Sequence, residues 1–203
     1  MKVISFFLIT LMISASCSKQ QDAVKYNKSG WAKYKTSDSK GAIDDYNKAI
    51  EEDPKNATSY NYRGLAKDKI GNYRGAIQDY SRAIELDSIN AFEPYKNRGL
   101  TKDKLKDFDG AIEDYSQAIK LNPKDASAYC SRGGSKHEIN DFKGSIQDLT
   151  KALELNPNNA KYYNNRGVCE AELGEKEKAC SDLNKAYELG FTKAFDLIKV
   201  LCK

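Results

Sequence analysis

Histidine is almost absent from this sequence. His137 is the only one in 203 residues, beside one tryptophan, two methionines and four prolines. A metal site or a histidine-based acid–base pair would have to be built around His137 and its neighbour Glu138, and a solvated or groove-lining histidine is the simpler interpretation. The HExxH, P-loop and Gly-x-Ser-x-Gly patterns are also missing. The sequence therefore predicts no catalytic residues, no metal site and no cofactor.

An excess of charge of one sign is missing too. Lysine and arginine number 33 against 29 aspartates and glutamates, a net charge of +4. Proteins that bind nucleic acid usually carry a strongly basic surface, so this balance predicts no nucleic-acid partner. The scarcity of proline, together with many Ala, Lys, Glu and Leu residues, favours helices.

The only long hydrophobic run lies at the N-terminus. Met1-Lys2 is followed by a mostly apolar run from Val3 to Ala15. This is shorter than the roughly 20 residues that a membrane-spanning helix needs, and a charge before a short apolar core and small residues is typical of a secretory signal. Ser14-Ala15-Ser16-Cys17 resembles a lipobox, although Ser14 stands where Leu, Val or Ile is usual. An ordinary signal peptide is the alternative.

This resemblance implies a signal peptide over 1–16 and a lipid anchor on Cys17, with residues 17–22 as a short tether. Ser18 stands after the cysteine where an aspartate would oppose sorting to the outer membrane. We therefore expect an exported lipoprotein that is membrane-anchored, on the outer membrane and facing the periplasm.

A repeat organises the rest of the chain. A short motif of a small residue, an apolar residue, a polar residue, Asp and a large residue recurs at spacings of 34, 35, 34 and 34 residues. It begins at Ala42, Ala76, Ala111, Ser145 and Ala179. A second motif keeps the same period, with glycine at 30, 64, 99, 133 and 167 and, in all copies but the first, arginine just before it. Periods of 20–50 residues indicate repeat architectures.

Each repeat predicts two helices. Apolar residues such as Ala76, Ile77, Tyr80 and Ile84 recur at helical spacing, while Gly71-Asn72 marks a loop. Prolines at 54, 123 and 157 follow second helices, which proline cannot continue. No strand-like alternation competes with this pattern.

The period, the glycines, the alanines and the prolines resemble the tetratricopeptide repeat. Arg for Leu, Lys for the second Tyr, and Ser88 or Phe191 for Pro depart from the pattern of that family. The resemblance implies an all-α, right-handed solenoid of five helix-turn-helix repeats plus a C-terminal capping helix. The predicted ranges are 23–56, 57–90, 91–125, 126–159 and 160–190 for the five repeats, and 191–203 for the capping helix.

The resemblance also implies a binding function. First helices line the concave face in this family, so we expect a protein or peptide partner on an exposed row of their residues. The predicted groove residues are Asn27, Trp31, Tyr34, Asn61, Leu65, Lys69, Lys96, Leu100, Lys104, His137 and Asn164. Family members that clamp a C-terminal carboxylate need a second asparagine where Trp31, Leu65 or Leu100 stands here, so no such clamp is expected. The leading hypothesis is an envelope scaffold. The alternatives are an assembly or pilotin-type lipoprotein of an outer-membrane machine, and an accessory subunit that binds glycan or peptidoglycan.

Two structural predictions concern cysteines and charges. Cys180 replaces the usual inter-repeat isoleucine, and Cys202 lies in the helix expected to pack there, so we expect a disulfide between them; the alternative is that Cys130, Cys169, Cys180 and Cys202 are small buried apolar residues. The first repeat has the recurring Asp but lacks the recurring Arg, which favours ion pairs across repeats. The predicted pairs are Asp45–Arg63, Asp79–Arg98, Asp114–Arg132 and Asp148–Arg166, with Asp182 left over.

Overall fold

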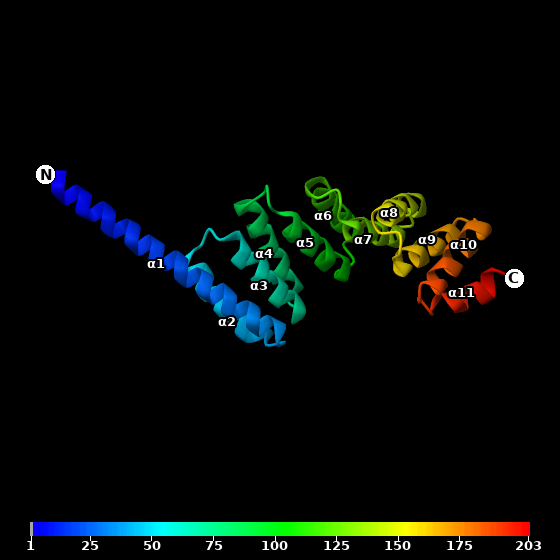
Figure 1. The fold of residues 1–203 in the computed structure, drawn as a ribbon, viewed down its shortest axis with the longest axis horizontal. Helices are drawn as coiled ribbons and strands as arrows, with labels where there is room; N and C mark the ends of the chain where they lie inside the picture. Colours follow the sequence, from blue (N-terminus) through cyan, green and yellow to red (C-terminus); the bar gives the residue numbers. More distant parts are fainter. Residues whose placement is uncertain (1) are drawn as a thin grey trace. The chain divides into compact units, whose positions relative to one another are not determined.

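The computed structural model describes the backbone from Lys2 to Lys203 and the side chains from Ser18 onward. The expected signal peptide, 1–16, and the expected lipidation site, Cys17, lie outside the residues whose side chains are described. In the described chain the structure has eleven α-helices and no strand, so the all-α prediction is confirmed (Figure 1). Their bounds are α1 Lys2–Lys35, α2 Ser39–Glu52, α3 Ala57–Lys69, α4 Tyr73–Leu86, α5 Phe92–Lys104, α6 Phe108–Leu121, α7 Ala126–Glu138, α8 Phe142–Leu155, α9 Ala160–Glu172, α10 Lys176–Glu188 and α11 Ala194–Leu201.

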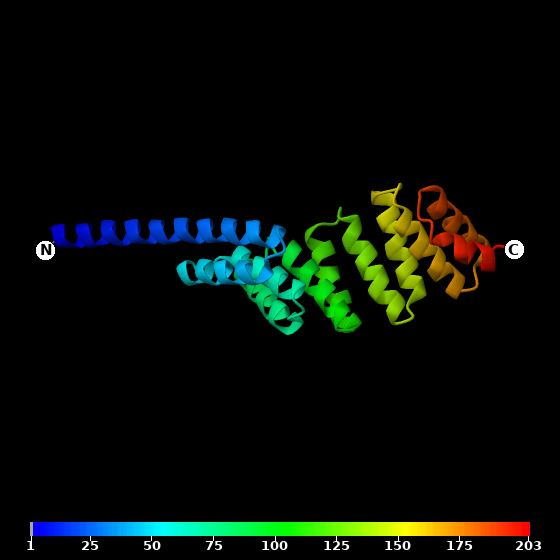
Figure 2. The same cartoon turned by 90° about the horizontal axis from the view of Figure 1, so that it is seen from below.

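The helices divide into two compact units. The N-terminal unit ends at Asn97, and the C-terminal unit runs from Arg98 to Lys203, so that α5 contributes to both. Within the N-terminal unit α1 packs against α2, α2 against α3 and α3 against α4. Within the C-terminal unit each helix from α6 to α11 is adjacent in sequence to one it packs on, and Figure 2 shows α7 to α10 lying side by side. Within each unit, hairpins that follow one another in sequence therefore pack together, as in other repeat proteins. No helix of the described residues is both long and apolar enough to cross a membrane.

The second helices begin in nearly the same way in repeats 1 to 4. An Asp or Asn side chain accepts a hydrogen bond from the backbone N–H of a glycine three residues later, as Asp38 does from Gly41 at 2.9 Å and Asp141 from Gly144 at 3.0 Å. Such caps satisfy backbone donors that the first helical turn leaves free. A Cβ on Gly144 would clash with the Asp141 carboxylate in its capping position, so glycine there leaves room for the cap. Repeat 5 lacks this arrangement, because Glu175 makes no side-chain cap and Lys178 replaces the glycine.

The repeated glycines of the first helices make room for large side chains of the second helices. In repeats 1, 2 and 3 a Cβ on Gly30, Gly64 or Gly99 would lie 2.7, 2.6 or 2.8 Å from the ring of a tyrosine in the same repeat. Those rings, of Tyr46, Tyr80 and Tyr115, are fully buried. Repeats 4 and 5 have Leu149 and Leu183 at this position instead. The nearest neighbours of the first three glycines are therefore aromatic rings.

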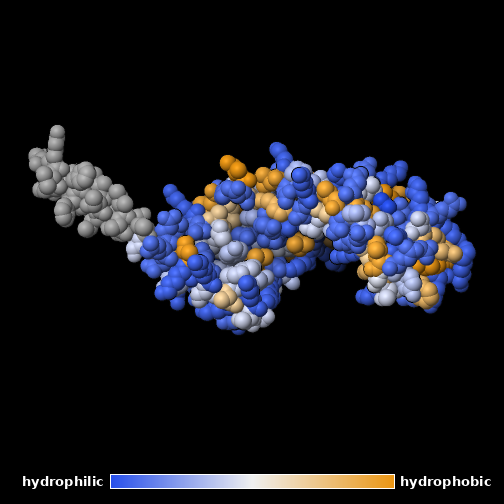
Figure 3. Space-filling model, in the orientation of Figure 1, coloured by the Kyte–Doolittle hydropathy of each residue, from blue (hydrophilic) through white to orange (hydrophobic). Residues whose placement is uncertain are grey.

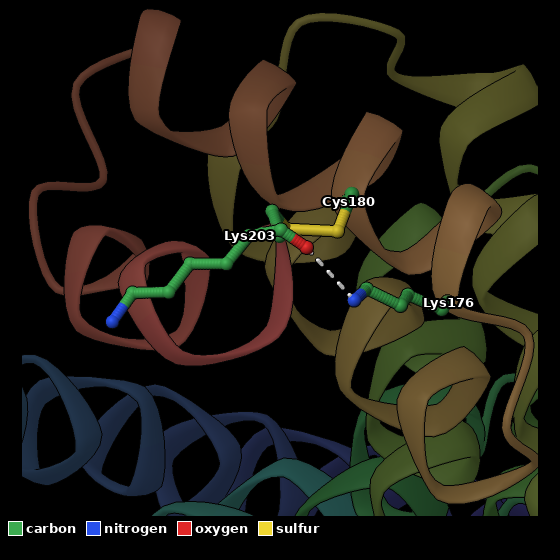
Figure 4. Close-up of a disulfide and its surroundings, with 4 residues drawn as sticks. Lys176, Cys180 and Lys203 are labelled. Atoms are coloured by element: carbon green, nitrogen blue, oxygen red, sulfur yellow. Dashed lines mark hydrogen bonds between the residues drawn. A yellow bond between two sulfur atoms is a disulfide. The ribbon is translucent and has the colours of Figure 1, made fainter.

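The predicted capping helix is present as α11. Ala194 is fully buried against Leu183 and Ala186 of α10, and Ile198 and Leu201 pack beside them. The structure joins Cys180 of α10 to Cys202 in a disulfide with 5.7 Å between the Cα atoms, which is within the range that a disulfide can bridge (Figure 4). Beside it Lys176 donates a hydrogen bond to the backbone carbonyl of Lys203 at 3.1 Å. The end of the chain is therefore held to the last hairpin by a covalent bond as well as by packing.

The short tether expected over 17–22 is helical where its side chains are described. The residues from Ser18 to Asp22 belong to helix α1. Lys19, Gln20 and Gln21 are good helix formers, and neither proline nor glycine interrupts them, so the helix of the first repeat continues through this segment. A helix rises only about 1.5 Å per residue, less than half the rise of an extended chain.

Candidate functional site

Some of the predicted groove residues of the N-terminal unit gather around Trp31. The indole stacks on Tyr34 of the same helix at 5.4 Å between ring centroids and on Tyr62 of α3 at 5.1 Å. The Lys69 ammonium lies 4.8 Å from the centre of the Tyr34 ring and donates to the Tyr34 carbonyl at 3.3 Å. The structure therefore brings Trp31, Tyr34 and Lys69 together, with Tyr62 as a member that the sequence did not single out.

A cavity of about 340 Å³ lies beside this aromatic cluster, between α1 and α3. We call it the N-terminal cavity; its lining residues are Val24, Asn27, Lys28, Trp31, Asn56, Thr58 and Tyr62. Asn27 donates from Nδ2 to the Ser59 hydroxyl at 2.8 Å, while its Oδ1 is buried and has no hydrogen-bond partner. An amide beside aromatic faces suits a peptide, whose backbone needs hydrogen bonds and whose side chains need apolar contact.

Asn61, Leu65 and Lys96, also predicted for the groove, lie elsewhere on the first helices. Asn61 is only 9% exposed, and its Oδ1 accepts a hydrogen bond from Asn97 at 3.2 Å. Leu65 is half-buried, and Lys96 is half-buried with its ammonium 4.6 Å from the centre of the Phe92 ring. The prediction that Asn61 is exposed is wrong, because the neighbouring first helix covers this position.

The C-terminal unit has a second cavity, of about 450 Å³, and one of the predicted groove residues, Lys104, lines it. Leu100 and Lys104 of α5 are both exposed, and Lys104 lines this cavity with residues of α7 and α9. Its other lining residues include Asp103, Cys130, Gly134, Ser135, Glu138, Lys161 and Asn165. Cys130 is buried, and burial raises the pKa of its thiol. Asn164 is half-buried, and its Oδ1 is enclosed without a hydrogen-bond partner.

His137 lines a third cavity, of about 210 Å³, which we call the His137 cavity. Its walls come from α7, α8 and α9, and the lining residues are Gly134, His137, Glu138, Ser145, Leu149, Asn165, Val168 and Cys169. The imidazole lies edge-on to Phe142 at 5.3 Å, and its Nε2 is buried and makes no hydrogen bond. The residues described contain no group of three or more His, Cys, Asp or Glu side chains that could hold a metal ion.

The recurring charges pair within repeats, and the prediction of pairs across repeats is wrong. Arg132 donates from Nε and Nη2 to the two carboxylate oxygens of Asp148 at 2.9 and 2.6 Å, and Lys136 reaches the same carboxylate at 2.8 Å. The equivalent pairs Arg63–Asp79, Arg98–Asp114 and Arg166–Asp182 have the same bidentate geometry. Asp182, expected to be left over, is therefore paired. The aspartates are nearly buried, so these bonds form in a medium of low dielectric.

Repeat 1 misled the prediction because another side chain replaces its missing arginine. Ser29 donates to Asp45 at 2.6 Å, and Lys33 pairs with the same carboxylate at 2.7 Å. Burial opposes ionisation of Asp45, but these two partners leave its pKa below the usual value. The arginines do reach the preceding repeat, through neutral acceptors: Nη1 of Arg63, Arg132 and Arg166 donates to Asn47, Ser116 and Thr150.

Repeat 5 departs from this arrangement at Glu170. The carboxylate stands where repeats 1 to 4 have the lysine that pairs with Asp, and it is 5% exposed. Its Oε1 lies 4.0 Å from the Arg166 Nε, and its Oε2 is buried without a hydrogen-bond partner. Burial and then the negative charge of Asp182 raise the pKa of Glu170 to about 7. Two carboxylates thus share one arginine in this repeat.

Sequence comparison matches most of the chain to one family. The tetratricopeptide repeat matches residues 92–125 and 45–78, and further models of it match 26–56 and 160–189; a TPR repeat matches 133–174. The chain belongs to the tetratricopeptide repeat family. The helical hairpins described above are therefore tetratricopeptide repeats, and the resemblance inferred from the sequence is confirmed.

Solved tetratricopeptide repeat structures share this fold. MamA is 25% identical, with a TM-score of 0.77 over 86% of this chain and 94% of its own. MamA from Desulfovibrio magneticus RS-1 is 19% identical, with a TM-score of 0.78 over 84% and 96%. YrrB, described as a TPR protein with an unusual peptide-binding site, is 23% identical, with a TM-score of 0.76 over 92% and 97%. No match was found among curated protein sequences.

Several cavity residues of this tetratricopeptide repeat protein were missed in the sequence. Tyr62, Leu149, Val168 and Cys169 were not among the predicted site residues. The sequence did contain evidence that could have identified Leu149, because this position is tyrosine in the first three repeats and leucine in the fourth. The surface does not mark these cavities either, because the face in Figure 3 is mostly hydrophilic and has hydrophobic residues scattered over it.

Proposed function

We propose that this protein binds segments of a partner protein on its first helices and holds that partner at a membrane through a lipid on Cys17. It would be a binding protein of the cell envelope and not an enzyme. The observation that supports binding is that each compact unit has cavities between consecutive first helices, lined by amides and apolar side chains together. Extended peptides bind best where both kinds of group are available. YrrB, a protein of similar fold, is described as having a peptide-binding site, which agrees with this proposal.

The first test places negative charge at exposed groove positions. Leu100→Glu with Lys104→Glu is expected to weaken partner binding by roughly 30-fold or more, because even one residue central to an interface can contribute about 2 kcal/mol. Both side chains are exposed, so the thermal unfolding midpoint should change little. Binding is measured by photo-crosslinking from a benzophenone amino acid at Leu100 in native membranes, followed by identification of the crosslinked partner and titration with it.

The matched control places the same changes on a second helix. Leu121→Glu with Lys120→Glu alters an exposed leucine and an exposed lysine of α6. This control should bind the partner as tightly as the native protein. Equal loss of binding in both variants would show that the first helices are not the binding surface.

The second test addresses the anchor. The native chain expressed in bacteria is expected to incorporate labelled palmitate and to partition into the detergent phase, whereas Cys17→Ser should lose both properties. Cys130→Ser removes another unpaired cysteine and should keep both. Because one acyl chain gives only marginal membrane binding, stable anchoring needs a second signal, such as a further acyl chain. Palmitate incorporation that persists in Cys17→Ser would refute lipidation at this cysteine.

A further inference from the structure

The His137 cavity exists because repeat 4 lacks a ring that repeat 3 has. In repeat 3 the ring of Tyr115 is fully buried, and its hydroxyl donates to Asp103 Oδ2 at 2.7 Å. The other oxygen of Asp103 accepts from the Ser135 hydroxyl of the following first helix at 2.7 Å. All three side chains lie in the C-terminal unit, and their polar groups are paired.

Each member of this trio is replaced 34 residues later. Leu149 stands for Tyr115, His137 for Asp103 and Cys169 for Ser135. Leucine is shorter than tyrosine, and the space that it leaves is the cavity of about 210 Å³ that these three residues line. An apolar cavity of about 150 Å³ is known to accept benzene, so this one has room for a substituted ring.

One polar group of the replaced trio is left without a hydrogen bond. It is the Nε2 of His137, a buried nitrogen with no partner, whereas Nδ1 of the same ring lies 4.0 Å from a carboxylate oxygen of Glu138. The Cys169 thiol is hydrogen-bonded to the Ser145 hydroxyl of α8 at 3.2 Å, whereas the Ser135 hydroxyl bonds to Asp103 of the preceding first helix. A buried polar atom without a partner is costly, and a ligand that supplies the partner recovers that cost.

We propose that the His137 cavity binds the side chain of a tyrosine from a partner segment, with its ring against Leu149 and Val168 and its hydroxyl at the His137 imidazole. The guest would occupy the place that Tyr115 occupies in the preceding repeat. Gly134 and Glu138, which are exposed, form the rim through which the side chain enters. This inference rests on the proposed function, because it names one side chain that the bound segment would contribute.

The test uses 4-methylphenol, which is the side chain of tyrosine, and toluene, which lacks the hydroxyl. In the full chain with labelled methyl groups, 4-methylphenol should shift the NMR signals of Leu149 and Val168 saturably, with a dissociation constant in roughly the millimolar range for a ligand of this size. His137→Leu keeps an open cavity but removes the hydrogen-bonding group. It should weaken binding of 4-methylphenol by about tenfold, as the loss of one buried hydrogen bond implies, and leave binding of toluene unchanged.

A second variant fills the cavity with the residues of repeat 3. Leu149→Tyr with His137→Asp should abolish the shift of the Val168 methyl signals, the reporter that this variant retains, while the protein remains folded. Gln147→Tyr adds the same ring at an exposed position of α8 and should bind 4-methylphenol like the native chain. Three results would each overturn the proposal: no saturable shift in the native protein, undiminished binding in the folded filled variant, or unchanged binding of 4-methylphenol in His137→Leu. None of them depends on partner capture, so the proposed function can fail or hold independently.

Discussion

Replacing Asp148 with alanine is expected to lower the free energy of unfolding by about 3–5 kcal/mol, the cost of leaving a buried charge without its partner. Asp148 is 4% exposed and accepts hydrogen bonds from Arg132 and Lys136. Without the carboxylate, the guanidinium of Arg132 stays between α7 and α8 with no counter-charge. Urea denaturation followed by circular dichroism measures the change, as a shift of the midpoint at constant slope.

The same helix provides the control. Glu154 of α8 also forms an ion pair, with Lys151 at 2.7 Å, but both side chains are about half exposed. Exposed pairs contribute at most about 1 kcal/mol, so Glu154→Ala should change stability little. If Asp148→Ala is no more destabilising than Glu154→Ala, the buried pairs do not hold the hairpins together. Replacing Arg132 and Asp148 together by apolar residues should cost less than removing the aspartate alone.

Replacing Glu170 with glutamine is expected to remove a pH dependence of stability between about pH 4.5 and 7. The folded protein raises the pKa of Glu170 to about 7, through burial and the charge of Asp182, while Arg166 and Lys178 oppose this and Glu175 adds to it. In that window the folded chain holds a proton that the unfolded chain has released. The free energy of unfolding of the native protein therefore falls as the pH rises through the window, and stays low above it.

The size of this effect follows from the shift in pKa. One unit corresponds to about 1.4 kcal/mol, so Glu170 should lower stability by roughly 2–4 kcal/mol between acid and neutral pH. Thermal or urea unfolding at a series of pH values measures it as the difference between the native and Glu170→Gln curves. Glu172→Gln, an exposed change on the same helix, should leave the native curve unaltered. Parallel curves for the native protein and Glu170→Gln from pH 5 to 7 would contradict the prediction.

The helical repeat could be predicted because it depends on local patterns that recur. Glycines, alanines and prolines at a constant period define the hairpins, and Cys202 falls on the amphipathic continuation after Gly190, so the capping helix follows from the sequence as well. The partners in the ion pairs could not be predicted from the arginine that repeat 1 lacks. The absence of arginine in repeat 1 suggested pairing across repeats, but Ser29 and Lys33 satisfy Asp45 instead.

The candidate site was harder to predict than the fold, because it depends on which first-helix positions the next helix covers. Asn61 and Cys130 occupy equivalent positions, and both are buried by the neighbouring first helix. The His137 cavity depends on a difference between repeats and not on the repeat itself. A comparison of Tyr115 with Leu149 indicates this cavity. A search for exposed positions that all repeats share overlooks it.

The arginine contacts have a consequence for how the array unfolds. Arg132 bonds to Asp148 within its own hairpin and to Ser116 of the hairpin before it, so one side chain contributes both to the stability of a repeat and to its coupling with a neighbour. In a one-dimensional chain of coupled elements, these two contributions decide whether the elements melt singly or together. Because the same guanidinium supplies both, a hairpin that opens also withdraws a bond from the one before it. Opening should therefore spread to neighbouring hairpins, and the C-terminal unit should melt as one cooperative block.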